Sequence, residues 1–376
     1  MNRCALIVDG NWLCLNKASF INFDIQDDAV IKQSKKLQLK QFMSDGLTYI
    51  LNKFESIITN IVIVSDGRGS WRKSLDIPQP RAEEGVTYKG NRGKDPSFDV
   101  DSVFGALNEF LEACRKAGIQ VLNAVSVEGD DWIWRLSNLF NNSHTSAIIW
   151  SSDQDLKQLI KYNNRSFIGW YNNKTMFLHS SCNNQIPPSQ EGLDIVEMML
   201  DGRFEQPVLQ NLLSSPIQIE YILPDDVVMK KIITGDASDN IKAILRKKIN
   251  ERFTNVTEKI WEETKESLKI NNLTEFFDRK SEIITNLLNH KKFKNSGISY
   301  EEADSLFEYN KRLVWLETSS YPTTILESIE SCISEDVIKK INNFDISLIK
   351  SNSKYILQFD EQASEIDDID FLFSSI

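Results

Sequence analysis

Short apolar runs alternate with amphipathic segments through the first half of the chain. The apolar runs that have the length and composition of buried strands lie at 4–10, 60–67, 119–127, 146–153 and 165–171. Between them, apolar residues recur at helical spacing over 38–58, 98–117 and 130–141. Strands that are apolar throughout and alternate with helices form parallel sheets covered on both faces, so we predict an α/β fold.

Two breaks divide the chain. The stretch 68–97 is rich in Gly, Pro, Arg and Lys, and a connection this long in a compact domain is usually functional or mobile. The stretch 180–192 has the composition of a linker. Beyond it, helical patterns predominate at 225–234, 255–270, 276–291, 301–316 and 323–341. We therefore predict a parallel-sheet domain over 1–182, a mainly α-helical domain over 183–350 and an acidic tail over 351–376.

The composition is that of a folded protein, with 41% hydrophobic and 26% charged residues and a net charge of −11. These values exclude a wholly disordered chain. No apolar run approaches the length of a membrane span, and the first one is interrupted at Asp9, unlike a signal peptide. We expect a cytoplasmic protein without a membrane partner.

Few residues are available for nucleophilic or thiolate chemistry. The chain has three histidines, far apart, and five scattered cysteines, none in a C-x-x-C pair. A Cys/His or Ser/His/Asp mechanism therefore lacks bases, and a zinc site lacks thiolates. We expect any chemistry to depend on carboxylates and metal ions.

Acidic residues stand at the ends of the predicted strands. Asp9, Asp66 and Asp153 end the first, second and fourth strands. The motif EGDD after the third strand and the residues after the fourth add further acids, namely Glu128, Asp130, Asp131 and Asp155. Because the ligand crevice of an open parallel sheet lies beyond the carboxyl ends of its strands, we expect these acids to face one shared crevice.

Two interpretations of these acids compete. An Asp that leaves a strand commonly caps the next helix, and capping is the simpler explanation for Asp130 or Asp153 alone. Capping does not explain the whole set, because clustered like charges oppose folding unless a cation neutralises them. Oxygen ligands without His or Cys favour Mg²⁺ or Mn²⁺, and a pair of such ions is the usual means of hydrolysing a phosphodiester. The acids Asp236 and Asp239, in ITGDASDNI, are candidates to complete a second metal site.

Basic residues gather in the loop 68–97, where they alternate with the aromatic residues Trp71 and Tyr88. The basic residues are Arg68, Arg72, Lys73, Arg81, Lys89, Arg92 and Lys94. Cations contact phosphates and flat rings stack on bases, so the pattern favours single-strand binding over a merely solvated loop. A second basic run either holds duplex backbone or forms a solvated helix face, and it consists of Lys242, Arg246, Lys247, Lys248 and Arg252.

Six motifs occur in an order that resembles the 5′-nuclease or flap endonuclease family, a PIN-like fold. They are VDGNW, VSDGRGSWRK, YKGNR, VEGDDWI, SSDQDLKQL and ITGDASDNI, and they span about 240 residues. The segment SLFEYNKRLVWLE at 305–317 is similar to the T-even-phage ribonuclease H branch of that family. The resemblance implies a structure-specific 5′→3′ exonuclease and flap endonuclease that removes RNA primers and 5′ flaps during replication. Its partners are then DNA and RNA–DNA hybrids with 5′ ends or flaps.

The resemblance also assigns metal ligands. It implies two Mg²⁺ ions, for which Mn²⁺ can substitute. The residues implied for the first ion are Asp9, Asp66, Glu128, Asp130 and Asp131. Those implied for the second ion, some of them through water, are Asp153, Asp155, Asp236 and Asp239.

The resemblance further implies that residues 68–97 contain a helical arch that admits the single strand. Lys89 then stabilises charge on the scissile phosphate with help from Arg92, Tyr88 stacks on a base, and Arg72 and Lys73 contact phosphate.

One part of the family pattern is missing. Family members commonly have a glycine-rich helix–hairpin–helix turn after the last acidic motif, but here the chain runs NIKAILRKKIN without glycine. Backbone amides approach phosphate less readily without glycine, so we expect basic side chains to hold the duplex instead. They are Lys242, Arg246, Lys247 and Lys248.

The acidic tail contains IDDIDFLF, which resembles the C-terminal peptides by which phage replication proteins engage a sliding clamp. Phe371, Leu372 and Phe373 are the candidate anchors for an apolar pocket. The alternative is a tail packed on the protein's own core. Binding of a single-strand DNA-binding protein through the helical domain fits the family equally well.

Two other functions stay open. The first is a PIN-like ribonuclease acting on single-stranded RNA, although a minimal PIN domain has neither the long basic loop nor the Asp236 and Asp239 pair. The second is a non-catalytic DNA-junction binder recruited by a clamp. Such a protein would have lost metal ligands, and none is lost in this sequence.

Overall fold

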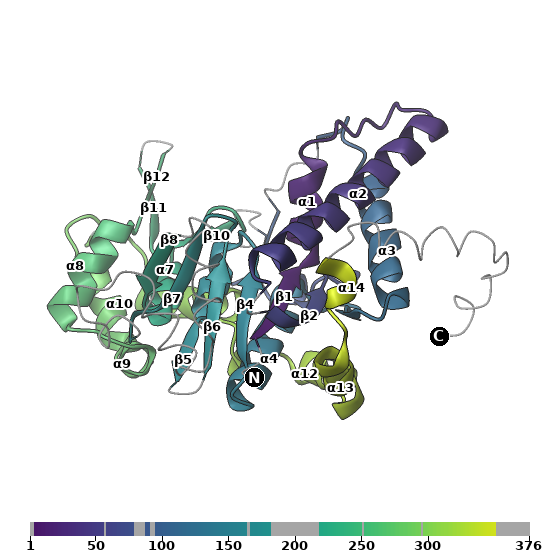
Figure 1. Cartoon of the computed structure of the whole chain (residues 1–376). Coiled ribbons are helices and arrows are strands. Elements are labelled where there is room, and N and C mark those ends of the chain that lie inside the picture. The colour runs from purple at the N-terminus through teal and green to yellow at the C-terminus, as the bar shows by residue number, and fades with distance from the viewer. Residues whose placement is uncertain are drawn as a thin grey trace.

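The computed structural model describes residues 4–55, 58–78, 87–90, 95–163, 166–181, 218–249, 252–294 and 296–350. Within these residues, eight strands form one sheet in the order β3-β2-β1-β4-β6-β7-β8, with β5 paired to β6 (Figure 1). Five neighbouring strands are parallel, namely β3 (Gln120–Leu122) at one edge, β2 (Ile58–Val64), β1 (Cys4–Asp9), β4 (Ser146–Trp150) and β6 (Ser166–Tyr171). The remaining strands are β5 (Lys161–Asn163), β7 (Thr175–His179) and β8 (Gln218–Ile222).

The strand β1 shows why helices cover both faces. All six of its residues are buried, and alternate side chains of a strand point to opposite faces. Leu6 and Val8 join a core formed with α1 (Gly10–Ala18), α2 (Ala29–Lys53) and α3 (Val100–Lys116). Ala5 and Ile7 join a second core, which contains α4 (Gly129–Asn142) and the C-terminal helices α12 (Thr323–Cys332) and α13 (Glu335–Asn343). The predicted α/β fold is confirmed, except that β5 and β7 each run antiparallel to β6.

A third core lies in the C-terminal half. It is formed by α7 (Pro224–Thr234), α8 (Glu258–Leu268), α9 (Leu273–Asp278), α10 (Lys280–Asn289) and α11 (Tyr300–Val314). Phe276 and Phe307 are fully buried there and stack with ring centroids 5.2 Å apart. This mainly helical region agrees with the sequence prediction. The predicted helix at 276–291 is divided at Arg279, and the one at 323–341 ends before Ser334, whose hydroxyl accepts a hydrogen bond from the backbone of α13.

The C-terminal half also returns to the sheet. The strand β8 extends the sheet beyond β7, and α13 contacts β2 and β3. Asn60 at the edge of β2 donates hydrogen bonds to the Ile341 carbonyl (3.2 Å) and to the Asn342 side chain (3.0 Å). The division near residue 182 stays a prediction, and both halves of the chain complete the layers around the sheet.

One predicted element has a different structure. The basic run was expected to hold duplex backbone or to be a helix face, but its residues lie on β10 (Ile241–Lys242) and on an antiparallel pair, β11 (Arg246–Ile249) and β12 (Arg252–Asn255). Figure 1 shows this pair projecting from the body of the molecule beside α8. The helix-face interpretation is therefore wrong.

Several predicted features lie outside the described residues. These are Arg92, the parts of the predicted arch at 79–86 and 91–94, the predicted linker from residue 182 onward, and the tail with Phe371, Leu372 and Phe373. None of the helices in the described ranges combines the length and apolar character needed to cross a membrane.

Candidate active site

Asp9 lies at the carboxyl end of β1 and is 8% exposed. Its Oδ1 accepts a hydrogen bond from the backbone of Trp12 (2.9 Å), which caps α1. Its Oδ2 accepts a hydrogen bond from the Ser151 hydroxyl at the end of β4 (2.7 Å). The carboxylate therefore caps a helix and also links two neighbouring strand ends.

Asp66 follows β2 and connects it to the acidic motif after β3. The backbone N–H of Gly129, the first residue of α4, donates to Asp66 Oδ1 (2.7 Å), and Asn11 donates to Oδ2 (3.0 Å). The positive end of a helix dipole thus faces Asp66. These bonds bring the ends of β1, β2 and the start of α4 to the same edge of the sheet.

The acids interact electrostatically across this edge. Burial, with smaller contributions from Asp66 and Asp153, raises the pKa of Asp9 to about 6. Burial, followed by the charge of Asp153, raises the pKa of Asp130 well above its ordinary value. Burial also raises the pKa of Asp153, and the charge of Asp239 raises it further. Acids from separate strand ends therefore repel one another in the metal-free protein.

Glu128 and Asp131 have a different environment, because Arg72 neutralises them. Arg72 is 2% exposed and donates to Glu128 (2.6 Å), to Asp131 (2.7 Å) and to the Leu313 carbonyl (3.2 Å). Burial acts to raise the pKa of Glu128, but Arg72 and Lys89 outweigh it and lower that pKa to about 2.

This arrangement corrects two sequence predictions. The guanidinium of Arg72 is enclosed between two carboxylates and the rings of Trp71 and Tyr321, so it is not presented to a phosphate. Asp131 is fully buried and also accepts bonds from the Trp71 indole (3.0 Å) and the Glu128 backbone (2.9 Å), so its oxygens are already occupied. Arg72 and Asp131 therefore support the neighbouring acids from the protein interior. Tyr321 packs against Arg72 as well, a contact that the sequence did not indicate.

Lys89 lies in the described segment 87–90 of the predicted arch and contacts the acids. Its backbone N–H donates to the Asp239 carbonyl (2.8 Å), and its ammonium lies 3.2 Å from Glu128. The neighbouring Tyr88 ring is buried at 6% exposure, with its hydroxyl 3.3 Å from Glu128, rather than open for base stacking as predicted. Lys73, on the short 3₁₀ turn η1 (Trp71–Ser74), is exposed.

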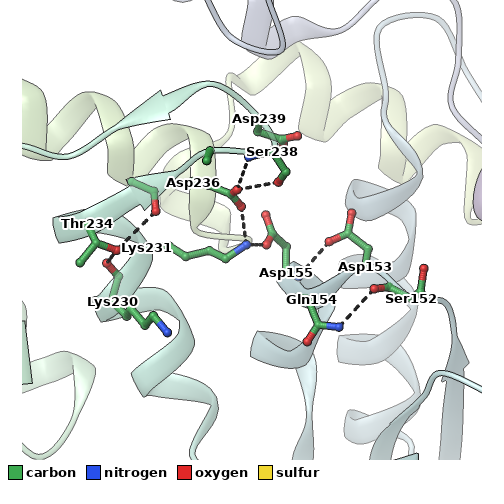
Figure 2. Close-up of a pocket in the computed structure, with 12 residues that line it drawn as sticks. Ser152, Asp153, Gln154, Asp155, Lys230, Lys231, Thr234, Asp236, Ser238 and Asp239 are labelled. Carbon is green, nitrogen blue, oxygen red and sulfur yellow. Dashed lines mark hydrogen bonds and ion pairs between the residues drawn. The ribbon is translucent and has the colours of Figure 1, made fainter. Parts of the chain in front are cut away.

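The second group of acids surrounds a cavity of about 530 Å³, which Figure 2 shows. Asp153 and Asp155 reach it from the end of β4 and the 3₁₀ helix η2 (Gln154–Leu159), and Asp236 and Asp239 from the turn after α7. The lysine Lys231 forms ion pairs with Asp155 and with Asp236 (2.6 Å).

A glycine makes this turn possible. Gly235 has a φ of +75°, and a Cβ there would meet the Ile241 carbonyl at 2.3 Å. Only glycine fits such a position without displacing the backbone. The hairpin of β9 (Gly235–Asp236) and β10 therefore holds Asp236 against the cavity.

The donor set fits a hard divalent cation in its chemistry. The side chains at this edge offer carboxylate oxygens without His or Cys, which suits Mg²⁺ or Mn²⁺. Within the described ranges, no three acidic, His or Cys side chains converge closely enough to hold an ion as they stand. The carboxylates instead bond to backbone donors, to Arg72 and to Lys231.

One predicted duplex-binding residue, Lys242, pairs with Gly235 of the cavity wall, and the other three lie on β11. Lys242, on β10, donates to the Asn240 side chain, and its carbonyl accepts from Asn310 (2.9 Å). Arg246 is half-buried on β11, and Lys247 and Lys248 follow on the same strand, opposite Thr254 and Phe253.

A mostly parallel sheet with acids gathered at its carboxyl edge, together with a helical C-terminal region, is the architecture of a resolvase-like domain of the PIN-like class. The family described as "5'-3' exonuclease, N-terminal resolvase-like domain" matches residues 5–185. Residues 5–185 are therefore similar to the N-terminal domain of the 5′-nuclease family. No curated protein matches the sequence significantly.

Solved structures of bacteriophage T5 proteins are similar in fold. The T5 5′-exonuclease with bound zinc has 14% sequence identity and a TM-score of 0.51, covering 95% of this chain and 100% of its own. The bacteriophage T5 flap endonuclease, in a pseudo-enzyme-product complex with DNA and metal ions, has 15% identity and a TM-score of 0.51, with 96% and 100% covered. Both likenesses extend over the C-terminal half of the chain.

Replacing Arg72 tests its structural role. We expect Arg72→Ala to lower the free energy of unfolding by about 3–5 kcal/mol, because two buried carboxylates lose their partner. The exposed Arg68, four residues earlier, is the control, and Arg68→Ala should change stability by less than about 0.5 kcal/mol. Urea unfolding followed by fluorescence measures both. Equal, small losses would show that the buried pairs contribute little.

The raised pKa of Asp9 predicts a pH-dependent stability. The folded protein keeps a proton on Asp9 up to about pH 6, whereas the unfolded chain releases it near 3.8, so stability falls as pH rises through this interval. We expect Asp9→Asn to stabilise the metal-free protein by up to about 3 kcal/mol near pH 8 and not at all near pH 3. Urea unfolding in EDTA across this range measures the difference, with the exposed Asp336→Asn as control. A gain that does not depend on pH contradicts the assignment.

Proposed function

We propose that the protein is a divalent-metal-dependent 5′-nuclease that hydrolyses phosphodiester bonds at 5′ ends and flaps, and that it removes RNA primers in the manner of a phage ribonuclease H. The observation that carries the proposal is the gathering of Asp9, Asp66, Asp130 and Asp153, with raised pKa values, at one edge of the sheet. Such a cluster is stable only with cations nearby. The metal ions and DNA in the similar T5 structures support the same function.

The side chains divide into two candidate metal sites, each expected to hold Mg²⁺, with Mn²⁺ as a substitute. Asp9, Asp66, Asp130 and Glu128 are the candidates for the first ion. The residues around the cavity of Figure 2 are the candidates for the second, namely Asp153, Asp155, Asp236 and Asp239. When bound, such ions supply an activated water and neutralise charge on the phosphate.

Lys89 is the proposed residue for stabilising charge on the scissile phosphate. It lies between the two groups of acids, near Glu128 through its ammonium and joined to Asp239 through its backbone. A cation held there by the fold is preorganised to face developing negative charge. Arg92, proposed to assist it, lies outside the described residues.

Nucleic-acid binding is proposed for local basic segments, since a chain of net charge −11 repels nucleic acid as a whole. The exposed Lys73 is a candidate contact for the single strand. The β11–β12 pair, which carries Lys247 and Lys248 and projects from the molecule, is proposed to bind duplex backbone in place of the glycine-rich hairpin of the family. The tail as a sliding-clamp anchor, and a single-strand DNA-binding protein as a further partner, stay predictions.

Cleavage of a labelled substrate tests the function. We expect the protein to cut a 5′-labelled flap and a nicked RNA–DNA hybrid near the junction or 5′ end with Mg²⁺ and not with EDTA. Asp153→Asn should abolish cutting, and the exposed Asp336→Asn should not. Denaturing gels measure the products. Tight flap binding without cutting under Mg²⁺ or Mn²⁺ would favour a junction binder, and cutting restricted to single-stranded RNA would favour a ribonuclease.

Replacing Lys89 tests charge stabilisation. We expect Lys89→Ala to lower kcat by about 10²–10³-fold with a small change in KM, because the lost interaction acts mainly in the transition state. The control is Lys116→Ala, which removes an exposed lysine at the end of α3. Single-turnover cleavage of the flap substrate measures both. A rise in KM at unchanged kcat would assign Lys89 to substrate binding instead.

A further inference from the structure

A lysine occupies the centre of the second group of acids. Lys231 lies on α7, which packs against η2, and its ammonium forms ion pairs with Asp155 of η2 and Asp236 of the following turn. The three side chains are only 11–17% exposed. Figure 2 shows the lysine side chain extended between the two acids at the cavity wall.

The neighbouring lysine shows that this position is specific. Lys230 lines the same cavity but directs its ammonium away, to Glu258 on α8 (2.6 Å). It is also more exposed, at 42% of its side chain compared with 17% for Lys231. Of these two neighbouring lysines on α7, Lys231 is therefore the one that pairs with Asp155 and Asp236.

Lys231 has a clear effect on the acids it contacts. Its ammonium lies 2.6 Å from Asp236 and also pairs with Asp155, so one cation joins the two carboxylates. An ammonium and a divalent ion repel strongly at the few ångströms that separate ligands of one site, so both cannot share these two carboxylates.

We propose that Lys231 is a resident cation that holds the space between Asp155 and Asp236 and has to be displaced before the second divalent ion binds there. This inference rests on the proposed two-metal function and adds a control on it. In the metal-free protein the lysine keeps both acids in an ion pair. It also lowers the affinity of the second site for a divalent ion relative to that of the first site. Loading of the second site is then the step at which ion concentration limits activity.

Metal binding without nucleic acid tests the proposal. Mn²⁺ binding to the full chain, followed by electron paramagnetic resonance of the free ion, gives the affinity of each site. We expect Lys231→Met to tighten the second Mn²⁺ by about tenfold or more, because a neutral side chain of similar length removes the competing charge. Lys231→Arg should remain as weak as wild type. The matched control Lys230→Met, which removes one charge from the same cavity wall, should change the affinity by less than about twofold.

Thermal unfolding gives an independent readout. Without metal, Lys231→Met should melt below wild type, since Asp155 and Asp236 lose their counter-ion. Saturating Mn²⁺ should raise its melting temperature more than that of wild type, since a ligand stabilises in proportion to its affinity. Equal Mn²⁺ affinities and equal metal-induced shifts for Lys231→Met and Lys230→Met would overturn the proposal.

Flap cleavage on the same preparations separates this proposal from the proposed function. If wild type cuts the flap but Lys231→Met binds Mn²⁺ no more tightly than Lys230→Met, the function stands and the resident cation is refuted. If Lys231→Met gains a tight Mn²⁺ site although wild type never cuts, the resident cation stands and the nuclease function is refuted.

Discussion

Crowding of negative charge at the carboxyl edge of the sheet is the constraint on which the rest of the site depends. Parallel strands end at the same edge, so an acid after each strand brings several carboxylates together whatever their distance in sequence. Burial makes the repulsion costly, as the raised pKa values of Asp9 and Asp130 show. The surrounding residues give several of these carboxylates a backbone N–H, a hydroxyl or a cation, as at Asp9, Asp66 and Asp236.

The internal cations also join the two halves of the chain. Arg72 neutralises Glu128 and Asp131 and donates to the Leu313 carbonyl at the end of α11. Lys231 of the C-terminal half neutralises Asp155 of the sheet domain. The edge of the sheet is thus completed by groups from beyond the predicted boundary. The acidic edge therefore depends on the packing of both halves of the chain.

The features that the sequence predicted are those that depend on residues close together in the chain. The central strands and the acids that end them are local features, and the parallel arrangement then places Asp9, Asp66 and Asp153 at one edge. The burial of Arg72 was not predictable, because its partners lie 56 and 59 residues away and α11 covers it. The β11–β12 pair was missed since strands of four residues, of which β11 is mostly basic, are too short to show an alternating pattern. The start of α2 at Ala29, nine residues before the predicted start, depends on capping by Asp28.

Capping and metal binding are compatible roles for the same acids. Asp9 uses Oδ1 to cap α1, and Asp153 uses Oδ1 to accept the Asp155 backbone N–H (2.9 Å), so each carboxylate is oriented by a bond to the main chain. The second oxygen of Asp9 accepts from a hydroxyl, a partner that rotates easily. Side chains fixed in this way lose little further conformational freedom when an ion binds, which is the general advantage of orienting a ligand through its neighbours. The cap is therefore compatible with the proposed binding of a cation, and a choice between the two roles is not required.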